Sequence, residues 1–271
     1  MSLAVMKKRI MVFTGLVQAR GFAHFGVDFN SLTVRASEFW TSCKIGDSIA
    51  INGCCLTITG IQEDQATFMI MEETLSKTIF RSQKVYSSSI VVNLEKALKY
   101  GENLGGHFIS GHIDGIYRIK ERINHDDGSC SLWISLGSQG GKYVVEKCSI
   151  AINGVSLTVA EIKRGYLTKD ESLSNDCLIR VSLIPHTLEN TTLMHNDEGD
   201  MLNIEFDQQL KHMQATEEVH VVESVQTKHR MEIVYKAPAF VPVDSSTVQS
   251  HYKILRVWTV GDNVHCEYES P

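Results

Sequence analysis

The segments SIAINGCCLTI at residues 48–58 and SIAINGVSLTV at residues 149–159 are nearly identical. Asn-Gly between two alternating apolar runs is the strongest short signal for a β-hairpin, because a type I′ turn needs positive φ at both central residues. Side chains alternate along the strand that follows, so each copy has one apolar face and one small polar face. The small face carries Cys55 in the first copy and Ser156 in the second, followed by a threonine in both.

Three further segments recur in the same order. FTGLV is followed by ISGHI, ETLSKTIF by HTLENTTL, and VVNLE by MLNIE, at residues 13–17 and 109–113, 73–80 and 186–193, and 91–95 and 201–205. An ordered set of this kind indicates an internal duplication. We therefore expect two homologous domains over residues 11–106 and 107–210. The tail at residues 211–271 matches neither half, and its sequence predicts no function.

Most of each half is typical of short β-strands. β-branched runs separated by turn signals favour a small barrel or a sandwich. The expected strands are 32–36, 48–52, 55–61, 66–71 and 90–95 in the first half, and 130–136, 149–153, 156–162, 178–184 and 201–206 in the second. Short helices are expected at ETLSKTIF and HTLENTTL, and at LEKALKYG (94–101), which ends in Gly101. The polar stretch 164–177 predicts a surface loop.

Composition limits the partners. The chain has 271 residues, 43% of them hydrophobic, and a formal net charge of -6, which gives no electrostatic footprint for nucleic acid. No stretch approaches the roughly 20 apolar residues of a membrane span, and the N-terminal residues lack the pattern of a signal peptide. Seven cysteines, an odd number without C-x-x-C spacing, predict cytoplasmic free thiols. A small molecule or another protein is the expected partner.

Seven motifs together resemble the riboflavin synthase family, whose chains hold a duplicated lumazine-binding domain. They are FTGLVQ, NGCCLT, EETL, GGHFISGHIDG, INGVSLTV, IPHTLENTTL and NIEFD, spread over residues 13–207. The resemblance implies an all-β fold of two six-stranded Greek-key barrels in tandem, with short helices. It also implies a homotrimer in which each active site lies between the N-terminal barrel of one chain and the C-terminal barrel of its neighbour.

The same resemblance implies an enzyme and a reaction. Two molecules of 6,7-dimethyl-8-ribityllumazine dismutate: one transfers a four-carbon unit to the other, a transferase reaction that gives riboflavin and 5-amino-6-ribitylaminouracil. No metal or organic cofactor is required. Such chemistry demands two similar pockets held face to face, with groups that remove methyl protons and position a nucleophile.

The resemblance also assigns residues to two pockets. The N-terminal pocket would be lined by Gly15, Leu16, Val17, Cys55, Leu56, Thr57, Met69, Ile70, Met71, Glu72, Glu73 and Thr74. The C-terminal pocket would be lined by Gly111, His112, Ile113, Lys147, Ser156, Leu157, Thr158, Ile184, Pro185, His186, Thr187 and Leu188. Further candidates close to the chemistry are Phe13, Thr14, Ser48, which would also bind substrate, and Asp207.

Among these residues, five are candidates for catalysis. The hydroxyls of Ser156 and Thr158 and the imidazole of His112 would handle protons, since a neutral imidazole accepts or donates near pH 7. Asp207 would orient them. Cys55 is a candidate for addition or proton transfer on the second lumazine, although only a thiolate attacks. Lys147 would hold a ring carbonyl or ribityl oxygen as a point charge.

Three other interpretations remain open at this stage. A non-catalytic lumazine- or flavin-binding antenna protein shares the duplicated fold but needs only one good pocket. A flavin-reductase barrel with a nucleotide-binding domain is disfavoured, because no G-x-G-x-x-G follows a strand. A metal site at His107 and His112 is weakly supported, because the two histidines have no third ligand in register; a structural hydrogen bond is the better interpretation of His107.

Overall fold

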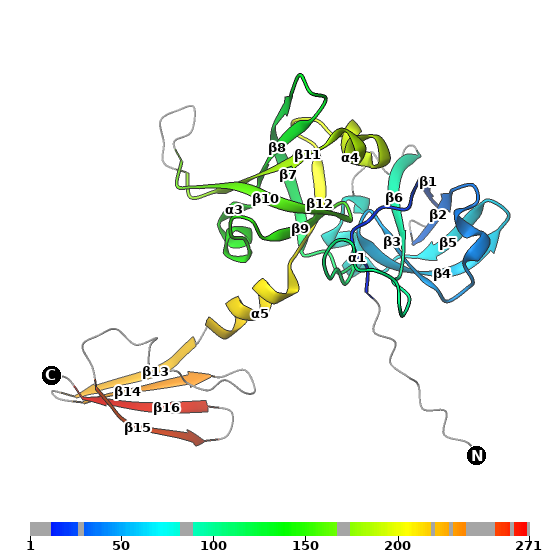
Figure 1. Cartoon of the computed structure of the whole chain (residues 1–271). Coiled ribbons are helices and arrows are strands. Elements are labelled where there is room, and N and C mark those ends of the chain that lie inside the picture. The colour runs from blue at the N-terminus through cyan, green and yellow to red at the C-terminus, as the bar shows by residue number, and fades with distance from the viewer. Residues whose placement is uncertain are drawn as a thin grey trace, which may run out of the picture. The chain divides into compact units, whose positions relative to one another are not determined.

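The computed structural model describes most of the chain (Figure 1). The described residues are 12–26, 30–81, 89–166, 174–217, 220–227, 230–236, 253–260 and 263–269. The centre of the loop predicted at 164–177 lies outside these ranges. The chain divides into two compact units, one that ends at Gln208 and a second that begins at Gln209.

The first unit holds two closed six-stranded barrels, which confirms the predicted fold class. The N-barrel consists of β1 (Ala19–Phe25), β2 (Ser31–Arg35), β3 (Ser48–Ile51), β4 (Cys54–Gln62), β5 (Gln65–Met69) and β6 (Ile90–Lys96). The C-barrel consists of β7 (Gly115–Asn124), β8 (Cys130–Ser135), β9 (Ser149–Ile152), β10 (Val155–Arg164), β11 (Cys177–Leu183) and β12 (Met201–Phe206). Corresponding strands follow one another in the same order around both barrels.

The residue pattern indicated ten of the twelve strands and missed the first strand of each barrel. The inward positions of β1 are Gly21 and Ala23, while Phe22 points outward and is exposed. Along β7 only Ile119 is buried. Neither segment therefore shows the apolar alternation by which a half-buried strand is recognised.

Two of the three predicted short helices form, and the third is wrong. ETLSKTIF forms α1 (Glu72–Lys77) and the 3₁₀ turn η2 (Ile79–Arg81), and HTLENTTL forms α4 (Pro185–Asn190) and η4 (Thr192–His195). Residues 94–101 are not helical: Leu94 is buried in β6, which extends to Lys96. The backbone is held by bonds to distant segments, such as Leu98 N–H to the carbonyl of Val12 at 2.8 Å. Three short elements were not predicted: η1 (Phe39–Ser42), α3 (Gly137–Gly140) and η3 (Gly141–Tyr143).

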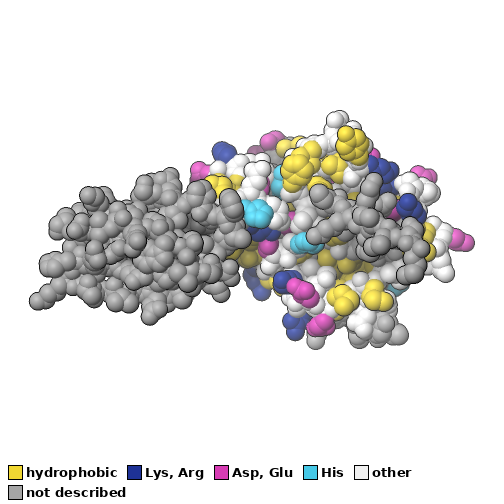
Figure 2. Space-filling view, turned by 90° about the horizontal axis from the view of Figure 1, so that it is seen from below, with side chains coloured by type: hydrophobic (Ala, Val, Ile, Leu, Met, Phe, Trp, Pro, Cys, Tyr) yellow, Lys and Arg dark blue, Asp and Glu magenta, His cyan; other side chains and the backbone are white. Residues whose placement is uncertain are grey.

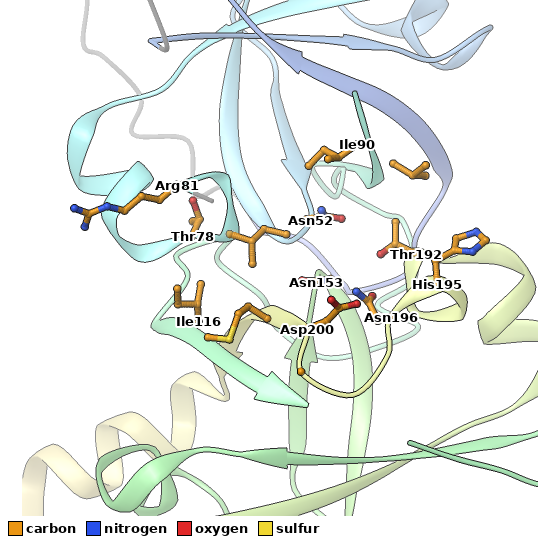
Figure 3. A pocket seen from close by; sticks show the side chains of 14 residues that line it. Asn52, Thr78, Arg81, Ile90, Ile116, Asn153, Thr192, His195, Asn196 and Asp200 are labelled. Atoms are coloured by element: carbon orange, nitrogen blue, oxygen red, sulfur yellow. The ribbon is translucent and has the colours of Figure 1, made fainter. Parts of the chain in front are cut away.

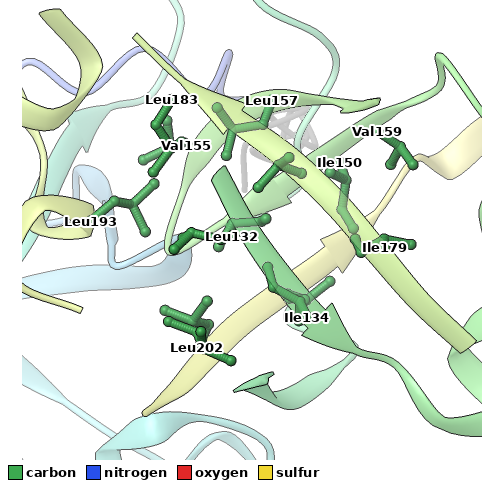
Figure 4. Packing of buried hydrophobic residues seen from close by; sticks show 14 of the residues in the cluster. Leu132, Ile134, Ile150, Val155, Leu157, Val159, Ile179, Leu183, Leu193 and Leu202 are labelled. Carbon is green, nitrogen blue, oxygen red and sulfur yellow. The ribbon is translucent and has the colours of Figure 1, made fainter. Parts of the chain in front are cut away.

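The repeated hairpins build the barrel cores as predicted. Asn52 and Asn153 take φ of 46° and 47°, and the glycine after each also has positive φ. The apolar face of each hairpin is buried, whereas Cys55 and Ser156 are half-buried on the opposite face. In the C-barrel, residues such as Leu132, Ile150 and Val159 meet inside the sheet (Figure 4). Burying a side chain of this size stabilises the fold by about 1.5–3 kcal/mol.

Four buried asparagines join the barrels, and we call them the asparagine ladder: Asn52, Asn93, Asn153 and Asn203. The side chain of Asn93 donates to the Asn153 carbonyl, and that of Asn203 to the Asn52 carbonyl, both at 2.9 Å. Each also accepts a main-chain N–H from a 3₁₀ turn at 2.8 Å, Asn93 from Thr192 and Asn203 from Ile79. The side chains of Asn93 and Asn203 thus bind the opposite barrel. The side chains of Asn52 and Asn153 accept a main-chain N–H of their own barrel.

The hairpin turns themselves touch at the centre of this junction. A Cβ added to Gly53 would lie 2.7 Å from the nitrogen of Gly154, and one added to Gly154 would lie 2.6 Å from that of Gly53. Only glycine permits this approach of two backbones. The Asn-Gly pair therefore serves both the turn and the contact between domains.

The tail forms a unit of its own kind. α5 (Gln208–Glu217) leads to β13 (His220–Thr227), β14 (Arg230–Lys236), β15 (Lys253–Val260) and β16 (Asn263–Glu269). The four strands make an antiparallel sheet in the order β13-β14-β16-β15. Among the described helices, none combines the length and apolar character that a bilayer span requires.

The asparagine ladder yields a stability prediction. We expect Asn93→Ala to lower the free energy of unfolding by about 3 kcal/mol, because it leaves the buried Thr192 N–H and Asn153 carbonyl without partners. Asn190→Ala, at an exposed position of α4, is the matched control and should shift stability by less than about 0.5 kcal/mol. Urea unfolding measures both. Equal shifts would show that the ladder contributes nothing particular.

Candidate functional site

The segment Thr14–Val17 leaves the N-barrel and lies against the C-barrel. The carbonyl of Gly15 accepts a hydrogen bond from the N–H of Ser156 at 2.9 Å. A Cβ on Gly15 would come within 2.6 Å of Ser156, and the φ of Gly15 is 78°. Val17 packs against the core of the C-barrel. The small-residue face of β10 is therefore covered by a segment from the other half of the chain.

The repeat places the equivalent segment, Ser110–Ile113, on the N-barrel. The carbonyl of Gly111 accepts from the N–H of Cys55 at 2.8 Å. A Cβ on Gly111 would meet the Cβ of Cys55 at 2.5 Å. Ile113 is buried within the core of the N-barrel. A two-residue β-bridge between Phe13 and Ile109 marks the point where the two segments pass each other.

This exchange corrects the predicted grouping of residues. Gly15, Leu16 and Val17 were assigned to the pocket of Cys55, and Gly111, His112 and Ile113 to that of Ser156. The structure brings the first set to Ser156 and the second to Cys55. Motif order along the chain could not reveal this crossing, because the segments connect the barrels and can fold back on either one.

Two buried glutamates hold the exchanged segments in place. Glu95 accepts from the N–H and hydroxyl of Thr14 at 2.6 and 2.8 Å, and from the N–H of Gly15 at 3.0 Å. Glu205 accepts from the N–H and hydroxyl of Ser110 at 2.8 and 2.7 Å, and from the N–H of Gly111 at 2.9 Å. Sequence reasoning missed both residues. The signal was available, because the repeated VVNLE and MLNIE end in an acid where an apolar strand continues.

The Ser156 hydroxyl contacts the imidazole of His107. Its Nδ1 lies 2.7 Å from Oγ of Ser156, and burial lowers the pKa of His107 below the ordinary value of 6.5. The carboxylate of Asp207 lies close enough to act on this pKa in the opposite direction. The imidazole is therefore neutral at pH 7 and can accept the proton of the serine. Ser156, His107 and Asp207 form one cluster, which we call the serine cluster.

The serine cluster changes the expected roles of the two histidines. His112 was the predicted proton carrier, and His107 was given only a structural hydrogen bond. The structure gives His107 the contact with Ser156, whereas His112 is exposed and follows Gly111 on the Cys55 side. The sequence signal for this contact was the glycine pair directly before His107. A Cβ on Gly106 would clash with Thr14 and Ser156, so the main chain that leads into His107 lies against the serine.

The Cys55 side is chemically different. Burial raises the pKa of the Cys55 thiol above its ordinary 9.0, and a hydrogen bond with Ser48 acts in the opposite direction. The neighbouring Cys54 points into the core, where burial raises its pKa to about 12. At neutral pH Cys55 is thus a thiol and not a thiolate, so it can exchange a proton or fill space but is not activated for attack.

The remaining predicted residues differ in burial. The side chains of Leu56, Ile70, Ile113, Leu157 and Leu188 belong to the barrel cores. Exposed or half-exposed around the two faces are Leu16, Thr57, Met69, Met71, Glu72, Glu73, Thr74, Lys147, Thr158, Ile184, Pro185, His186 and Thr187. Ser48 is buried and borders a cavity of about 730 Å³ beside Lys96 and Lys99.

Several of the exposed residues at these faces are large and apolar. Leu16 is 50% exposed, Met69 64% and Ile184 60%. Exposed hydrophobic side chains also stand among polar ones in the space-filling view (Figure 2). Where such side chains lie together, they mark a surface that contacts a ligand or another protein. Within the part of the chain that the structure describes, no group of three or more His, Cys, Asp and Glu side chains could hold a metal ion.

Comparison with known proteins agrees with this architecture. The model of the lumazine binding domain matches the chain twice, at residues 14–97 and 110–207. Riboflavin synthase from Actinobacillus pleuropneumoniae is 37% identical over 199 residues, which cover 72% of this chain and 85% of the relative. Riboflavin synthase from Bacillus subtilis is 34% identical over 205 residues, covering 74% and 88%.

Solved structures support the fold. The crystal structure of LumP complexed with 6,7-dimethyl-8-(1'-D-ribityl) lumazine superimposes with a TM-score of 0.57 at 24% identity, covering 71% of this chain and 98% of LumP. LumP complexed with riboflavin gives a TM-score of 0.60 at 22% identity, covering 72% and 100%. The chain therefore belongs to the family of proteins built on the lumazine binding domain, together with the riboflavin synthases to which it is similar.

Proposed function

We propose that this protein is a riboflavin synthase. It converts two molecules of 6,7-dimethyl-8-ribityllumazine into riboflavin and 5-amino-6-ribitylaminouracil by transfer of a four-carbon unit, as a transferase. The observation that carries the proposal is the pair of equivalent faces with unequal chemistry, a hydroxyl bound to an imidazole at Ser156 and a neutral thiol at Cys55. A dismutation needs two copies of one substrate to be treated differently, and a diverged duplication provides such a pair.

At the C-barrel the serine cluster supplies proton transfer. Nδ1 of His107 accepts the hydroxyl proton of Ser156 as that oxygen engages the substrate, and the carboxylate of Asp207 stabilises the imidazolium that results. Thr158 lies on the same face of β10, two residues along the strand. Lys147, exposed at the turn before β9, would bind a substrate oxygen.

At the N-barrel the thiol of Cys55 and the exposed imidazole of His112 stand where Ser156 and Leu16 stand in the other half. The Cys55 thiol keeps its proton, so it serves as a hydrogen-bond donor or proton carrier to the bound ring. His112 follows directly on Gly111, whose carbonyl binds the Cys55 main chain. The two sites therefore offer different proton carriers to identical substrates.

The exposed apolar residues support assembly as a homotrimer. Met69 and Met71 border the N-barrel face, while Leu16 and Ile184 border the C-barrel face, and each is at least half exposed in a single chain. Pairing the N-barrel face of one chain with the C-barrel face of another would bury them and bring two lumazines together. The proposed enzyme acts in the cytoplasm and uses no metal or organic cofactor.

A direct assay tests the function. We expect purified protein incubated with 6,7-dimethyl-8-ribityllumazine to accumulate riboflavin, followed by its absorbance, with one riboflavin formed per two lumazines consumed. Stoichiometric binding of lumazine without turnover would contradict the enzyme and favour a non-catalytic antenna protein. Sedimentation velocity on the same sample measures the assembly state.

The serine cluster is tested by substitution. We expect Ser156→Ala and His107→Gln each to lower kcat by about 100-fold while leaving the unfolding transition in place, since positioned acid-base groups contribute factors of this order. Ser37→Ala, an exposed serine after β2, is the matched control and should leave kcat unchanged. Unchanged turnover in both cluster variants would remove the serine and histidine from the chemistry.

The same histidine predicts a pH dependence. Because burial lowers the pKa of His107, the folded chain binds the proton less readily than the unfolded chain. Its contribution to stability is therefore complete above about pH 6.5 and is lost as the pH falls through the lowered folded pKa. We expect His107→Gln to flatten the acid limb of the stability profile and of the rate profile. An unaltered acid limb in thermal melts from pH 4 to 8 would contradict this.

A further inference from the structure

A second cavity lies between the barrels, beside the asparagine ladder. Its volume is about 840 Å³, within the range typical of small-molecule sites. None of the residues assigned to catalysis or lumazine binding borders it. The described residues that line it are Asn52, Thr78, Ile79, Arg81, Ile90, Val91, Ile116, Asn153, Thr192, His195, Asn196, Gly199, Asp200 and Met201 (Figure 3).

Its two walls are copies of each other that have diverged. Ile79 and Thr192 are equivalent, because each donates its main-chain N–H to the asparagine of the opposite barrel. Ile90 and Asp200 are equivalent by the repeat that aligns VVNLE with MLNIE. At both positions the N-barrel presents isoleucine and the C-barrel a polar side chain. At these two positions the N-barrel wall is apolar and the C-barrel wall, which we call the polar wall, can form hydrogen bonds. Thr78 and Arg81 add polar groups to the N-barrel wall.

The polar wall carries two buried atoms without partners. Among the described residues, Oγ1 of Thr192 and Oδ1 of Asn196 make no hydrogen bond. Thr192 is only 6% exposed, and its side chain borders the cavity. Buried polar atoms are nearly always paired, so an unpaired one at a cavity takes its bond from whatever fills that cavity.

The neighbouring Thr191 shows that the 3₁₀ turn does not by itself leave a threonine hydroxyl without a hydrogen-bond partner. The hydroxyl of Thr191 donates to the carbonyl of Thr187 at 2.8 Å and accepts from the N–H of Leu193 at 3.3 Å. Thr191 therefore completes the local structure, whereas the hydroxyl of Thr192 is left for the cavity. Of these two successive threonines, only Thr191 uses its hydroxyl in a hydrogen bond within the fold.

The unpaired atoms are also held firmly. Nη1 of Arg122 donates to the carbonyls of Leu193 and Asn196 at 3.1 and 2.6 Å. The N–H of Asp197 donates to the carboxylate of Asp200 at 3.0 Å. The main chain that carries Thr192 and Asn196 is thus fixed before any ligand arrives, which limits the entropy lost on binding.

We propose that this cavity binds a flat, neutral heteroaromatic molecule with a cyclic amide edge. A ring N–H would donate to Oδ1 of Asn196, and the adjacent ring carbonyl would accept the hydroxyl of Thr192. The apolar face of the ring would lie against Ile79, Ile90 and Val91. Arg81 and Asp200, of opposite charge, both border the cavity, which is consistent with a ligand without net charge. This site is separate from the proposed lumazine sites.

Lumiflavin is a suitable probe, because it has the cyclic amide edge and no ribityl chain. Binding to the full chain is followed by quenching of lumiflavin fluorescence. Thr192→Val keeps the shape of the side chain and removes the hydroxyl. We expect Thr192→Val and Asn196→Ala each to weaken lumiflavin binding by about tenfold. Ser156→Ala should retain this binding, since Ser156 does not border the cavity. Unchanged affinity in Thr192→Val and Asn196→Ala, or lost affinity in Ser156→Ala, would overturn the proposal.

Thermal melting of the free variants provides the matched control. Thr192→Val should melt at or above the temperature of the parent chain, because it removes a buried hydroxyl without a partner. Thr191→Val should melt below it, because it removes two hydrogen bonds. A Thr192→Val variant as destabilised as Thr191→Val would give the hydroxyl a structural role and refute the site. We expect Thr192→Val to turn over lumazine at the rate of the parent chain. This measurement separates the cavity from the proposed enzymatic activity.

Discussion

Exchange of buried amide hydrogen bonds between the barrels is the constraint on which the structure depends. Asn93 and Asn203 each bind a hairpin of the opposite barrel and a 3₁₀ turn of the opposite barrel with one side chain. Such bonds have strict geometry, so they fix the distance and the rotation between the two halves. The contact of Gly53 with Gly154, the crossing of the segments at Phe13 and Ile109, and the cavity beside the ladder all follow from that placement.

The duplication, the hairpins and the fold class could be predicted because they depend on local signals repeated at matching positions. Asn-Gly specifies its turn wherever it occurs, and apolar alternation specifies a half-buried strand. The sequence did not indicate β1 and β7, because the inward residues of β1 are small and β7 has only one buried residue. The helix expected at 94–101 was wrong because helix-forming residues there are held by bonds to segments far along the chain.

For the candidate site, the sequence could identify the motifs but not their partners. Ser156 and Asp207 were expected, and the structure places both near an imidazole, yet the imidazole is His107 and not His112. Which of two histidines five residues apart meets a serine depends on the direction in which the connecting segment crosses, and no periodicity encodes that direction. Hydrogen bonds to the buried Glu95 and Glu205 hold the crossed segments in place, and this role becomes visible only in three dimensions.

The exchanged segments also bear on how such a chain could arise. A polypeptide with only one repeat would carry a segment whose carbonyl accepts from an N–H on a second barrel, so it could complete this hydrogen bond only in a symmetric dimer. Joining two copies in one chain makes that association intramolecular and independent of protein concentration. After fusion, the two halves no longer need to have the same sequence. Cysteine can replace serine, and isoleucine can replace threonine, on one side alone, which no symmetric dimer of a single gene product can achieve.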